Sequence, residues 1–322
     1  MNSTNLNSMN SEKKNHKAIF NYNYSSFIYK EIIIMKILSF GEVLWDVYPD
    51  AAHLGGAPLN FAAHLALQGA DAYFVSAVGK DELGEETVQE VEKLGVKTDY
   101  ISVSDKETGK CLVTLDENAV PKYNLLTDVA YDHIAMPEFS ADDEFDAIAF
   151  GTLALRMNNN IEVLKDIIRT ANYKEIYSDL NIRPPFYSDE SISFCMSNAT
   201  IVKISDEELP TVTQSLLKKE LDVKSAAEAL SEAFGQLKLI IITCGAEGSC
   251  AYDCISKTFY EAPVVPVKVV STVGAGDSFG AAFLYKYFNK EDIQSCLEYA
   301  SKVSAMVVSH KDAIPKDLYN SL

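Results

Sequence analysis

The sequence predicts an α/β protein built on a mostly parallel β-sheet with helices on both faces. Short apolar runs of strand-like length alternate with longer segments that carry apolar residues at helical spacing, and the connections between them are short. This alternation is typical of a parallel sheet that is covered on both sides. Apolar residues make up 48% of the 322 residues, which is enough for the core of one large domain.

The predicted elements follow one another from residue 37 to residue 243. Gly69 and Gly95 end the first two helices, because glycine readily adopts the backbone conformation found just after a helix. In chain order, the expected elements are strand 37–40, helix 59–68, strand 72–78, helix 82–94, strand 147–150, helix 161–171, strand 176–179, strand 200–204, helix 225–234 and strand 239–243.

One stretch departs from the alternation and predicts a β-hairpin. Residues 111–116 alternate apolar and polar side chains, a turn follows at Asn118, and residues 122–127 are again extended in character. Together with a loop over residues 47–54, this hairpin is expected to form a small β appendage. The lid over a site at the carboxyl edge of the sheet would then comprise about residues 47–54 and 107–130. The alternative is an ordinary hairpin at the sheet edge.

The charge of the chain limits its partners. The formal net charge is −18, whereas nucleic acids and anionic membranes are bound by basic surfaces, so neither is an expected partner. No apolar stretch approaches the roughly 18 residues of a membrane-spanning helix. The six cysteines include no C-x-x-C pair, and we expect free thiols rather than a metal site. These observations favour a cytoplasmic protein.

The first 34 residues differ in composition from the rest of the chain. They are rich in Asn, Ser and Lys and show no sustained amphipathic period, whereas a strand-like run begins directly after Met35. We interpret residues 1–34 as an unstructured extension, or as a segment that precedes the true translation start. Residues 35–322 are then expected to form the folded domain.

The segment around residue 277 carries the clearest functional signal. A strand-like run over residues 264–270 leads into the motif Gly274-Ala275-Gly276-Asp277, and an apolar helix follows over residues 281–288. The two glycines let successive backbone N–H groups converge at the positive end of the helix, where they can bind phosphate. A carboxylate at Asp277 would repel that phosphate, unless it takes a proton from an attacking hydroxyl, as phosphoryl transfer requires. The alternative is that Asp277 only caps the helix.

Two other classes of nucleotide-binding protein fit this segment poorly. A dinucleotide-binding turn has the pattern G-x-G-x-x-G, but the third glycine here is Gly280, which is one position late. The sequence also contains no G-x-x-x-x-G-K-[ST] motif, which excludes a P-loop kinase. A phosphotransferase of another kind is therefore favoured.

The same segment is similar to the C-terminal signature of the PfkB, or ribokinase-like, family of carbohydrate kinases. The run Gly55-Gly56-Ala57-Pro58-Leu59-Asn60-Phe61-Ala62 resembles a second family signature, and the likeness extends over residues 35–315. Residues 41–46 and 114–118 resemble those of bacterial fructokinases. The resemblance implies a ribokinase-like three-layer α/β/α fold with a small β-hairpin lid. It also implies an ATP-dependent kinase of a small free sugar, with ATP and Mg²⁺ as cofactors.

The resemblance further implies which residues act. Asp277 would be the catalytic base, and the backbone of Gly274, Ala275 and Gly276 would stabilise the transferring charge. Glu208 would hold Mg²⁺ through water. The residues implied to bind the sugar are Asp46, Gly55, Gly56, Asn60 and Arg183. The residues implied to bind ATP are Asn181, Thr243, Gly245, Gly248, Thr272 and Ser301.

Several of these roles have a structural alternative when the residues are considered alone. Asp46 can be an ordinary loop acid and Asn60 a helix-start residue, although a carboxylate and an amide also suit sugar hydroxyls. Arg183 can form a surface salt bridge. The turn Thr243-x-Gly245-x-x-Gly248 can be a plain hairpin turn.

The most specific expectation is transfer of the γ-phosphoryl group of ATP to D-fructose, which gives fructose 6-phosphate. Another sugar, 2-keto-3-deoxygluconate or a nucleoside is an alternative acceptor, because side chains outside the motifs set specificity. A non-catalytic binding or regulatory relative is an alternative from a different class. Relatives form lid-to-lid dimers, so the resemblance also implies a homodimer.

Three positions depart from the family pattern. Ser205 replaces the Asn of an Asn-x-x-Glu motif, although Glu208 is retained. Ser271 replaces an Asp and Asp312 replaces a Gly in the region that binds an activating potassium ion in many relatives. The departures at Ser205 and Ser271 are what keep the non-catalytic alternative open.

We predict that the reaction depends weakly or not at all on potassium, because a carboxylate is lost at Ser271. Asp312 would replace that carboxylate only in part. The initial rate with Mg·ATP and the sugar should be nearly the same in potassium chloride and in sodium chloride at equal ionic strength. A large rate increase on replacing sodium with potassium would overturn this prediction.

Overall fold

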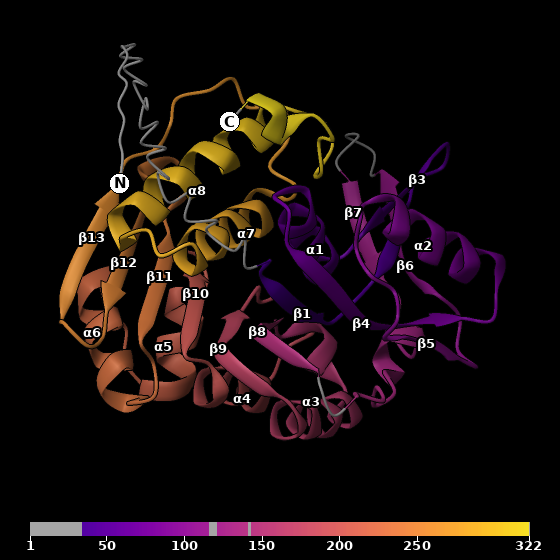
Figure 1. Cartoon of the computed structure of the whole chain (residues 1–322), viewed down its shortest axis with the longest axis horizontal. Coiled ribbons are helices and arrows are strands. Elements are labelled where there is room, and N and C mark those ends of the chain that lie inside the picture. The colour runs from indigo at the N-terminus through magenta and orange to yellow at the C-terminus, as the bar shows by residue number, and fades with distance from the viewer. Residues whose placement is uncertain (1–33, 116–120, 141–142, 322) are drawn as a thin grey trace, which may run out of the picture. The chain divides into compact units, whose positions relative to one another are not determined.

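The computed structural model describes residues 34–115, 121–140 and 143–321, and its larger β-sheet forms the centre of this part of the chain (Figure 1). Seven neighbouring strands of that sheet run parallel, and the last two form an antiparallel hairpin at one edge. The mostly parallel sheet expected from the sequence is therefore confirmed. The strand order is β13 (Thr258–Ala262), β12 (Ser249–Asp253), β11 (Leu239–Thr243), β10 (Ile201–Ser205), β9 (Asn172–Asp179), β8 (Glu144–Phe150), β1 (Lys36–Phe40), β4 (Asp71–Gly79) and β5 (Ile101–Ser104).

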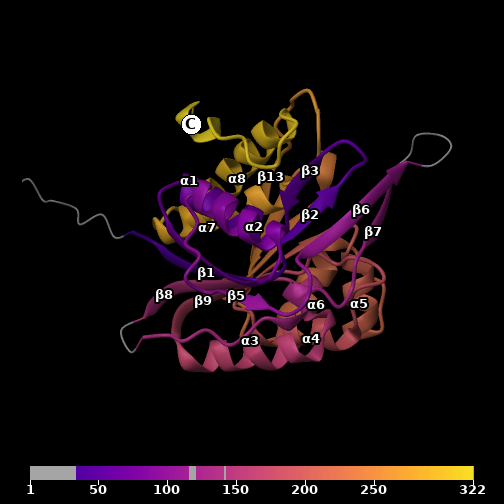
Figure 2. The same ribbon diagram turned by 90° about the vertical axis from the view of Figure 1, so that its right-hand side faces the viewer.

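Helices cover both faces of this sheet and give the three layers that the sequence predicted (Figure 2). One face carries α1 (Ala57–Leu67), α2 (Glu82–Lys93), α7 (Ala275–Phe288) and α8 (Ile293–Val308). The other face carries α3 (Asn158–Thr170), α4 (Asp189–Asn198), α5 (Leu209–Leu217) and α6 (Val223–Ala233). Ile37 and Leu38 are adjacent in β1 and fully buried, but they lie in different hydrophobic cores, because successive strand residues point to opposite faces.

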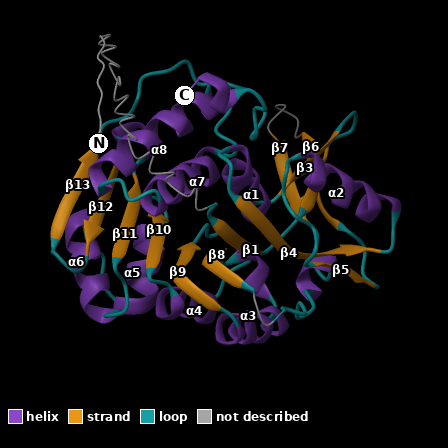
Figure 3. Ribbon diagram, in the orientation of Figure 1, coloured by secondary structure: helices purple, strands orange, loops and turns teal. Residues whose placement is uncertain are grey.

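A second, four-stranded sheet stands apart from the larger one (Figure 3). Its antiparallel β6–β7 pair is the hairpin that the alternation of residues 111–116 predicted. The predicted loop over residues 47–54 is instead a second hairpin, formed by β2 and β3. This sheet suits the expected lid, although its role as a lid stays a prediction. Its strand order is β3 (Ala52–Gly55), β2 (Leu44–Val47), β6 (Gly109–Leu115) and β7 (Pro121–Leu125).

Two expectations near residue 277 are wrong. Residues 264–270 form no strand, since Pro263 and Pro266 lack the backbone N–H groups that a ladder needs and the valines between and after them are largely exposed. The last strand, β13, ends at Ala262. Helix α7 begins at Ala275 rather than at residue 281, so the glycine-rich motif forms the first turn of the helix.

Two other expectations concern residues that the structure does not describe. The extension over residues 1–34 lies outside the described residues except for Ile34, and the turn at Asn118 also lies outside them. Within the part that is described, no helix has the length and apolar character needed to cross a membrane.

A buried ion pair joins the two short 3₁₀ helices η1 (Ala130–His133) and η2 (Leu153–Arg156). The Asp132 side chain is fully buried and the Arg156 side chain is 6% exposed. The guanidinium donates two hydrogen bonds of 2.7 Å to the carboxylate of Asp132. It donates a third, of 2.8 Å, to the carbonyl oxygen of Leu126, just after β7, so the pair also anchors the base of the second sheet.

We predict that Asp132→Ala lowers the free energy of unfolding by about 3–5 kcal/mol, because the variant leaves the Arg156 guanidinium buried without its counter-charge. Urea denaturation followed by circular dichroism measures the change. Glu162→Ala is the matched control, since it breaks the exposed pair between Glu162 and Lys165 and should cost less than about 1 kcal/mol. Equal effects of the two substitutions would contradict the prediction.

Candidate active site

The candidate active site lies where five neighbouring parallel strands end. Strands β11, β10, β9, β8 and β1 are adjacent in the sheet, so the loops that follow them emerge at one edge. Those loops, or the strand ends, carry Thr243, Glu208, Asn181, Thr152 and Glu42 in that order. Residues far apart in the chain are thereby brought to one edge, which is where ligands bind in folds of this kind.

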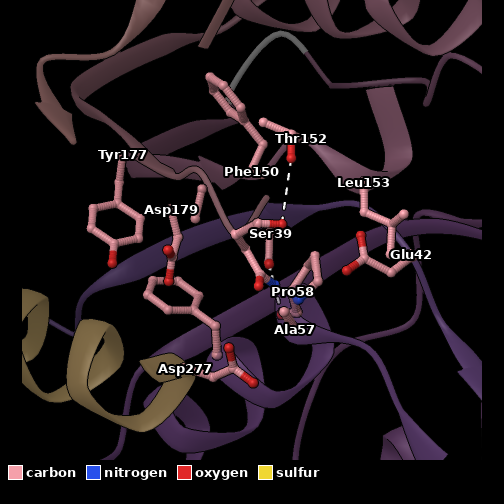
Figure 4. Close-up of a pocket in the computed structure, with 14 residues that line it drawn as sticks. Ser39, Glu42, Ala57, Pro58, Phe150, Thr152, Leu153, Tyr177, Asp179 and Asp277 are labelled. Atoms are coloured by element: carbon pink, nitrogen blue, oxygen red, sulfur yellow. Dashed lines mark hydrogen bonds between the residues drawn. The ribbon is translucent and has the colours of Figure 1, made fainter. Parts of the chain in front are cut away.

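A pocket opens at this edge and is surrounded by carboxylates (Figure 4). Glu42 follows β1, Asp179 ends β9 and Asp277 lies in the first turn of α7, and all three line the pocket. Asn181 lines it as well. The rest of the wall is mostly apolar or small and includes Pro58, Phe61, Phe150 and Leu153.

The start of α7 is fixed by Gly274, which occupies the N-cap position with φ +78°. A Cβ atom there would lie 2.8 Å from the Cβ of Ala313, so both the backbone conformation and the space require glycine. Asp277 lies in the first helical turn, so the alternative that it is the N-cap residue does not hold. The N–H groups of this turn have no acceptor within the helix, so the motif combines a carboxylate with anion-binding donors.

A hydrogen bond of 2.8 Å connects the N-terminal and C-terminal parts of the site, from Asn60 Nδ2 to Asp277 Oδ2. Asn60 lies in the first turn of α1, which begins directly after Gly56. Gly56 has φ +122°, and a Cβ atom on it would lie 2.4 Å from the carbonyl oxygen of Glu42. Glycine at this position therefore lets α1 start against the chain that leaves β1, which brings Asn60 to Asp277.

The pKa of Asp277 is raised above its ordinary value, chiefly because the carboxyl group is buried. The hydrogen bond from Asn60 and the charges of Lys203 and Arg183 act in the opposite direction and favour the carboxylate. These opposing effects leave Asp277 more basic than an exposed aspartate, which suits a group that accepts a proton.

Lys203 is a site residue that the sequence analysis missed. It lies in β10 with a side chain that is 5% exposed, and its Nζ donates a hydrogen bond of 2.8 Å to Asp179 Oδ2. A Cβ atom on Gly276 would lie 3.2 Å from this Nζ, so the ammonium group lies against the first turn of α7. Burial raises the pKa of Asp179 to about 6 even beside this lysine. The available signal was a lysine inside an apolar strand, which is rare unless the lysine is paired.

The sequence analysis also missed Glu42, although it noted residues 41–46, which contain it. The residue is 3% exposed. The pKa of its carboxyl group is raised to about 7, chiefly by burial. The charge of Asp277 contributes to this rise, whereas that of Arg183 opposes it. An acid directly after the first strand of a parallel sheet was the available signal.

Glu208 connects two of the loops at the edge. Its two carboxylate oxygens accept hydrogen bonds from the backbone N–H groups of Ile182 and Ser205. The N–H of Glu208 in turn donates to the Ser205 hydroxyl at 3.2 Å. The serine that departs from the family pattern thus holds the start of this turn, and Glu208 keeps further lone pairs for a water molecule.

Of the remaining residues predicted to bind sugar, Asp46 and Gly55 lie together on the second sheet. A Cβ atom on Gly55 would lie 3.4 Å from Asp46 Oδ2. Burial raises the pKa of Asp46, and a hydrogen bond from the Cys111 thiol lowers it. Arg183 is exposed in the loop after β9, and its positive charge acts on both Asp277 and Glu42.

The residues predicted to bind ATP gather beside α8, except for Asn181, which lines the pocket. Thr243 is paired with Ser249 across the β11–β12 hairpin, and the Ser249 hydroxyl lies 3.4 Å from that of Ser301 in α8. Gly245 and Gly248 form the turn of this hairpin. The turn is therefore a hairpin turn, which was the structural alternative to an ATP-binding turn. It lies at the same edge of the sheet as the pocket, so an ATP-binding role stays a prediction. The carbonyl of Thr272 accepts a hydrogen bond from the N–H of Ala275, at the start of α7.

A comparison of the chain with known protein families agrees with this fold and with the glycine-rich turn at Asp277. The family described as pfkB family carbohydrate kinase matches residues 36–318. The chain belongs to the pfkB family of carbohydrate kinases. The resemblance inferred from the sequence is therefore confirmed, as is the ribokinase-like fold.

Known relatives of this pfkB kinase carry different names. The chain is 27% identical to the probable fructokinase-5 of Arabidopsis thaliana, and the match covers 87% of this chain and 93% of the relative. It is also 27% identical to the 5-dehydro-2-deoxygluconokinase of Listeria monocytogenes, over 88% and 90% of the two chains. A solved structure of an uncharacterized sugar kinase from Pyrococcus horikoshii in complex with ATP has a TM-score of 0.71 and 28% identity, over 86% and 94% of the two chains. The family therefore establishes a sugar kinase and leaves the acceptor open.

We predict that Asn60→Ala makes the stability of the protein more sensitive to pH. The pKa of Asp277 is raised in the folded state, so stability is lost as the pH rises and the carboxyl group ionises. Without the donor at Asn60 the pKa rises further, so the melting temperature should fall more than that of the wild type from about pH 5 to about pH 8.

Differential scanning calorimetry of the two proteins across this pH range tests the prediction. Asn289→Ala is the matched control, because the amide of Asn289 donates to the carbonyl of Tyr285 at the other end of α7 and touches no carboxylate. Its effect on the melting temperature should not vary with pH. The prediction fails if the effect of Asn60→Ala is equally constant.

Proposed function

We propose that this pfkB kinase transfers the γ-phosphoryl group of ATP to a hydroxyl group of a small free sugar. D-Fructose is the proposed acceptor and fructose 6-phosphate the proposed product. The observation that carries the proposal is the position of Asp277, in the first turn of α7 and within a pocket at the carboxyl edge of the sheet. A base and a set of backbone N–H donors at one helix end are the two groups that phosphoryl transfer requires.

In the proposed reaction, Asp277 accepts the proton of the attacking sugar hydroxyl. Asn60 holds Oδ2 of this carboxylate, which leaves Oδ1 for the proton. The sugar oxygen forms a bond to the γ-phosphorus while the bond to the bridging oxygen breaks, and ADP leaves. The N–H groups of Gly274, Ala275 and Gly276 are proposed to stabilise the charge on the transferring group, although that of Ala275 also donates to the Thr272 carbonyl. The exposed Arg183 is proposed to pair with the same charge.

Magnesium, when bound to the ATP phosphates, neutralises part of their charge. Among the residues that the structure describes, no group of three or more His, Cys, Asp or Glu residues is arranged to hold a metal ion. This fits an ion held mainly by the phosphates and water, as Mg²⁺ is in many kinases. Glu208 is the proposed residue that orders the water around it, and Thr243, Gly245, Gly248, Thr272, Asn181 and Ser301 are proposed to hold the nucleotide.

The proposed sugar contacts come from several elements. Asn60 of α1 and Arg183 in the loop after β9 act next to Asp277, whereas Asp46 and Gly55 belong to the second sheet and Gly56 connects that sheet to α1. Closure of that sheet over the pocket would exclude water that otherwise hydrolyses ATP. Fructose is favoured over other sugars because residues 41–46 resemble those of fructokinases, and a relative named as a probable fructokinase agrees with this choice.

An ADP-release assay with Mg·ATP tests the proposal directly. The full chain is assayed with fructose, ribose, glucose, 2-keto-3-deoxygluconate and adenosine. Turnover of fructose alone supports the whole proposal. Turnover of another acceptor supports the kinase and refutes fructose, whereas folded protein that turns over none of them favours a binding or regulatory role.

We predict that Asp277→Asn lowers kcat by about a hundredfold to ten-thousandfold, because an amide of the same shape cannot accept the proton. ATP affinity, measured by calorimetric titration, should stay close to that of the wild type. Asp292→Asn is the matched control, since Asp292 is the exposed N-cap residue of α8 and asparagine also caps helices well. Retained turnover in Asp277→Asn would remove Asp277 from the role of base.

A further inference from the structure

We propose that the Lys203 ammonium, which lies in the space left by the missing side chain of Gly276, holds Asp277 in the ionised state that accepts a proton. This inference rests on the proposed function, in which Asp277 is the base. Lys203 is assigned as a positioning residue, because it acts on the first turn of α7 and on Asp277 rather than on the substrate.

The ammonium group of Lys203 packs against the glycine-rich first turn of α7. A Cβ atom on Gly276 would lie 3.2 Å from its Nζ and 3.9 Å from its Cε. The Lys203 side chain is only 5% exposed, and its Nζ donates a hydrogen bond of 2.8 Å to Asp179 Oδ2. The ammonium cannot move aside without leaving this counter-charge, so a methyl group at position 276 would crowd it.

The backbone conformation does not explain the glycine at position 276. Its φ is not in the left-handed region, in contrast with that of Gly274. The residue also lies inside a helix, where alanine is ordinarily the more stable residue. The neighbouring Lys203 therefore gives a structural reason for glycine here, besides the N–H group that Gly276 offers in the proposed reaction.

Lys203 is also the buried one of the two cations that act on Asp277, since Arg183 is exposed. A buried charge acts through a lower effective dielectric constant and is screened less than an exposed one. The remaining titratable groups whose charges interact with Asp277 are acids, namely Glu42 after β1 and Tyr177 and Asp179 of β9. Lys203 thus opposes both the burial of Asp277 and the negative charges around it.

Three carboxylates keep Lys203 itself charged. Burial lowers the pKa of its ammonium, but the charge and hydrogen bond of Asp179 outweigh this effect, together with the charges of Glu208 and Asp277. The pKa of Lys203 is therefore raised above its ordinary value, so its charge is constant over the pH range in which a carboxyl group titrates.

The test compares Lys203→Met with Asp179→Asn, which break the same ion pair from its two sides. Only Lys203→Met removes the cation. Asp277 should therefore ionise at a pH about one unit or more higher in Lys203→Met than in Asp179→Asn, which is the usual effect of one close opposite charge. Carbon-13 NMR of the full chain, labelled at its aspartate carboxyl groups, follows this titration without any need for turnover. The resonance of Asp277 is the one that Asp277→Asn lacks.

Equal titrations of Asp277 in the two variants, or the reverse order, would overturn the inference. If the protein phosphorylates a sugar, the pH at which kcat falls on acidification should follow the same order, whereas loss of structure alone would lower kcat equally at every pH. A wild type that turns over no sugar, combined with the expected order of titrations, would count against the proposed function and still support the effect of Lys203 on Asp277.

A second experiment tests the packing at Gly276 and decides the matter if Lys203→Met fails to fold. Gly276→Ala is introduced into the wild type and into the double variant Lys203→Met/Asp179→Asn, which leaves neither member of the ion pair charged. The melting temperature should fall in the wild type, where the methyl group meets the ammonium. It should rise in the double variant, because methionine is one atom shorter than lysine and alanine favours the helix.

Gly235→Ala is the matched control for this cycle, because a Cβ atom on Gly235 would have no heavy atom within 4 Å. Its effect on the melting temperature should be the same with and without the ion pair. If the effect of Gly276→Ala is also the same in the two backgrounds, Lys203 does not occupy the space beside Gly276 and the inference fails.

Discussion

The hydrogen bond between Asn60 and Asp277 is the interaction on which the rest of the site depends. It joins residues that are 217 positions apart and fixes the first turn of α1 against the first turn of α7. Both turns can approach only because glycine precedes them, at Gly56 before α1 and at Gly274 before α7. The two glycine-rich motifs of the sequence therefore have one common physical purpose, which is to bring two helix starts to one carboxylate. The pocket and the glycine-rich first turn of α7 are arranged around that point.

Burial of acids is the second constraint, and it costs stability. Glu42, Asp46, Asp179 and Asp277 all have a pKa that burial raises, so each is less stable as an anion than it would be in water. Each also has a donor or cation beside it: the Ala57 N–H, the Cys111 thiol, Lys203 and Asn60 respectively. Such arrangements cluster at functional sites, because the chemistry requires groups with shifted pKa values and the rest of the fold compensates for their cost.

The sequence predicted the sheet, most of its strands and the β6–β7 hairpin, because periodicity and glycine positions are local signals. It failed at residues 264–270, where valines suggested a strand but Pro263 and Pro266 prevent pairing. It also placed the start of α7 too late, because glycines at positions 276 and 280 weaken the helical pattern although they lie inside the helix. Within the site, Lys203 and Glu42 were missed, because their importance lies in contacts with residues from distant strands and helices. The sequence motifs pointed to Asp277 and Asn60, whereas their hydrogen bond was not predicted.

The base of the second sheet and the pocket at the carboxyl edge of the larger sheet are linked by buried charges. Arg156 pairs with Asp132 and binds the carbonyl that follows β7, so it belongs to the base of the second sheet. Its charge also acts on Glu42, and Glu42 in turn acts on Asp277 at the other side of the pocket. Among the described residues, the Tyr131 hydroxyl and Arg156 Nη1 have no hydrogen-bond partner, and such buried groups cost about 1–3 kcal/mol each. A shift of the second sheet that moved these groups would change the electrostatic environment of Glu42, so the position of this sheet and the charge of the pocket are physically coupled.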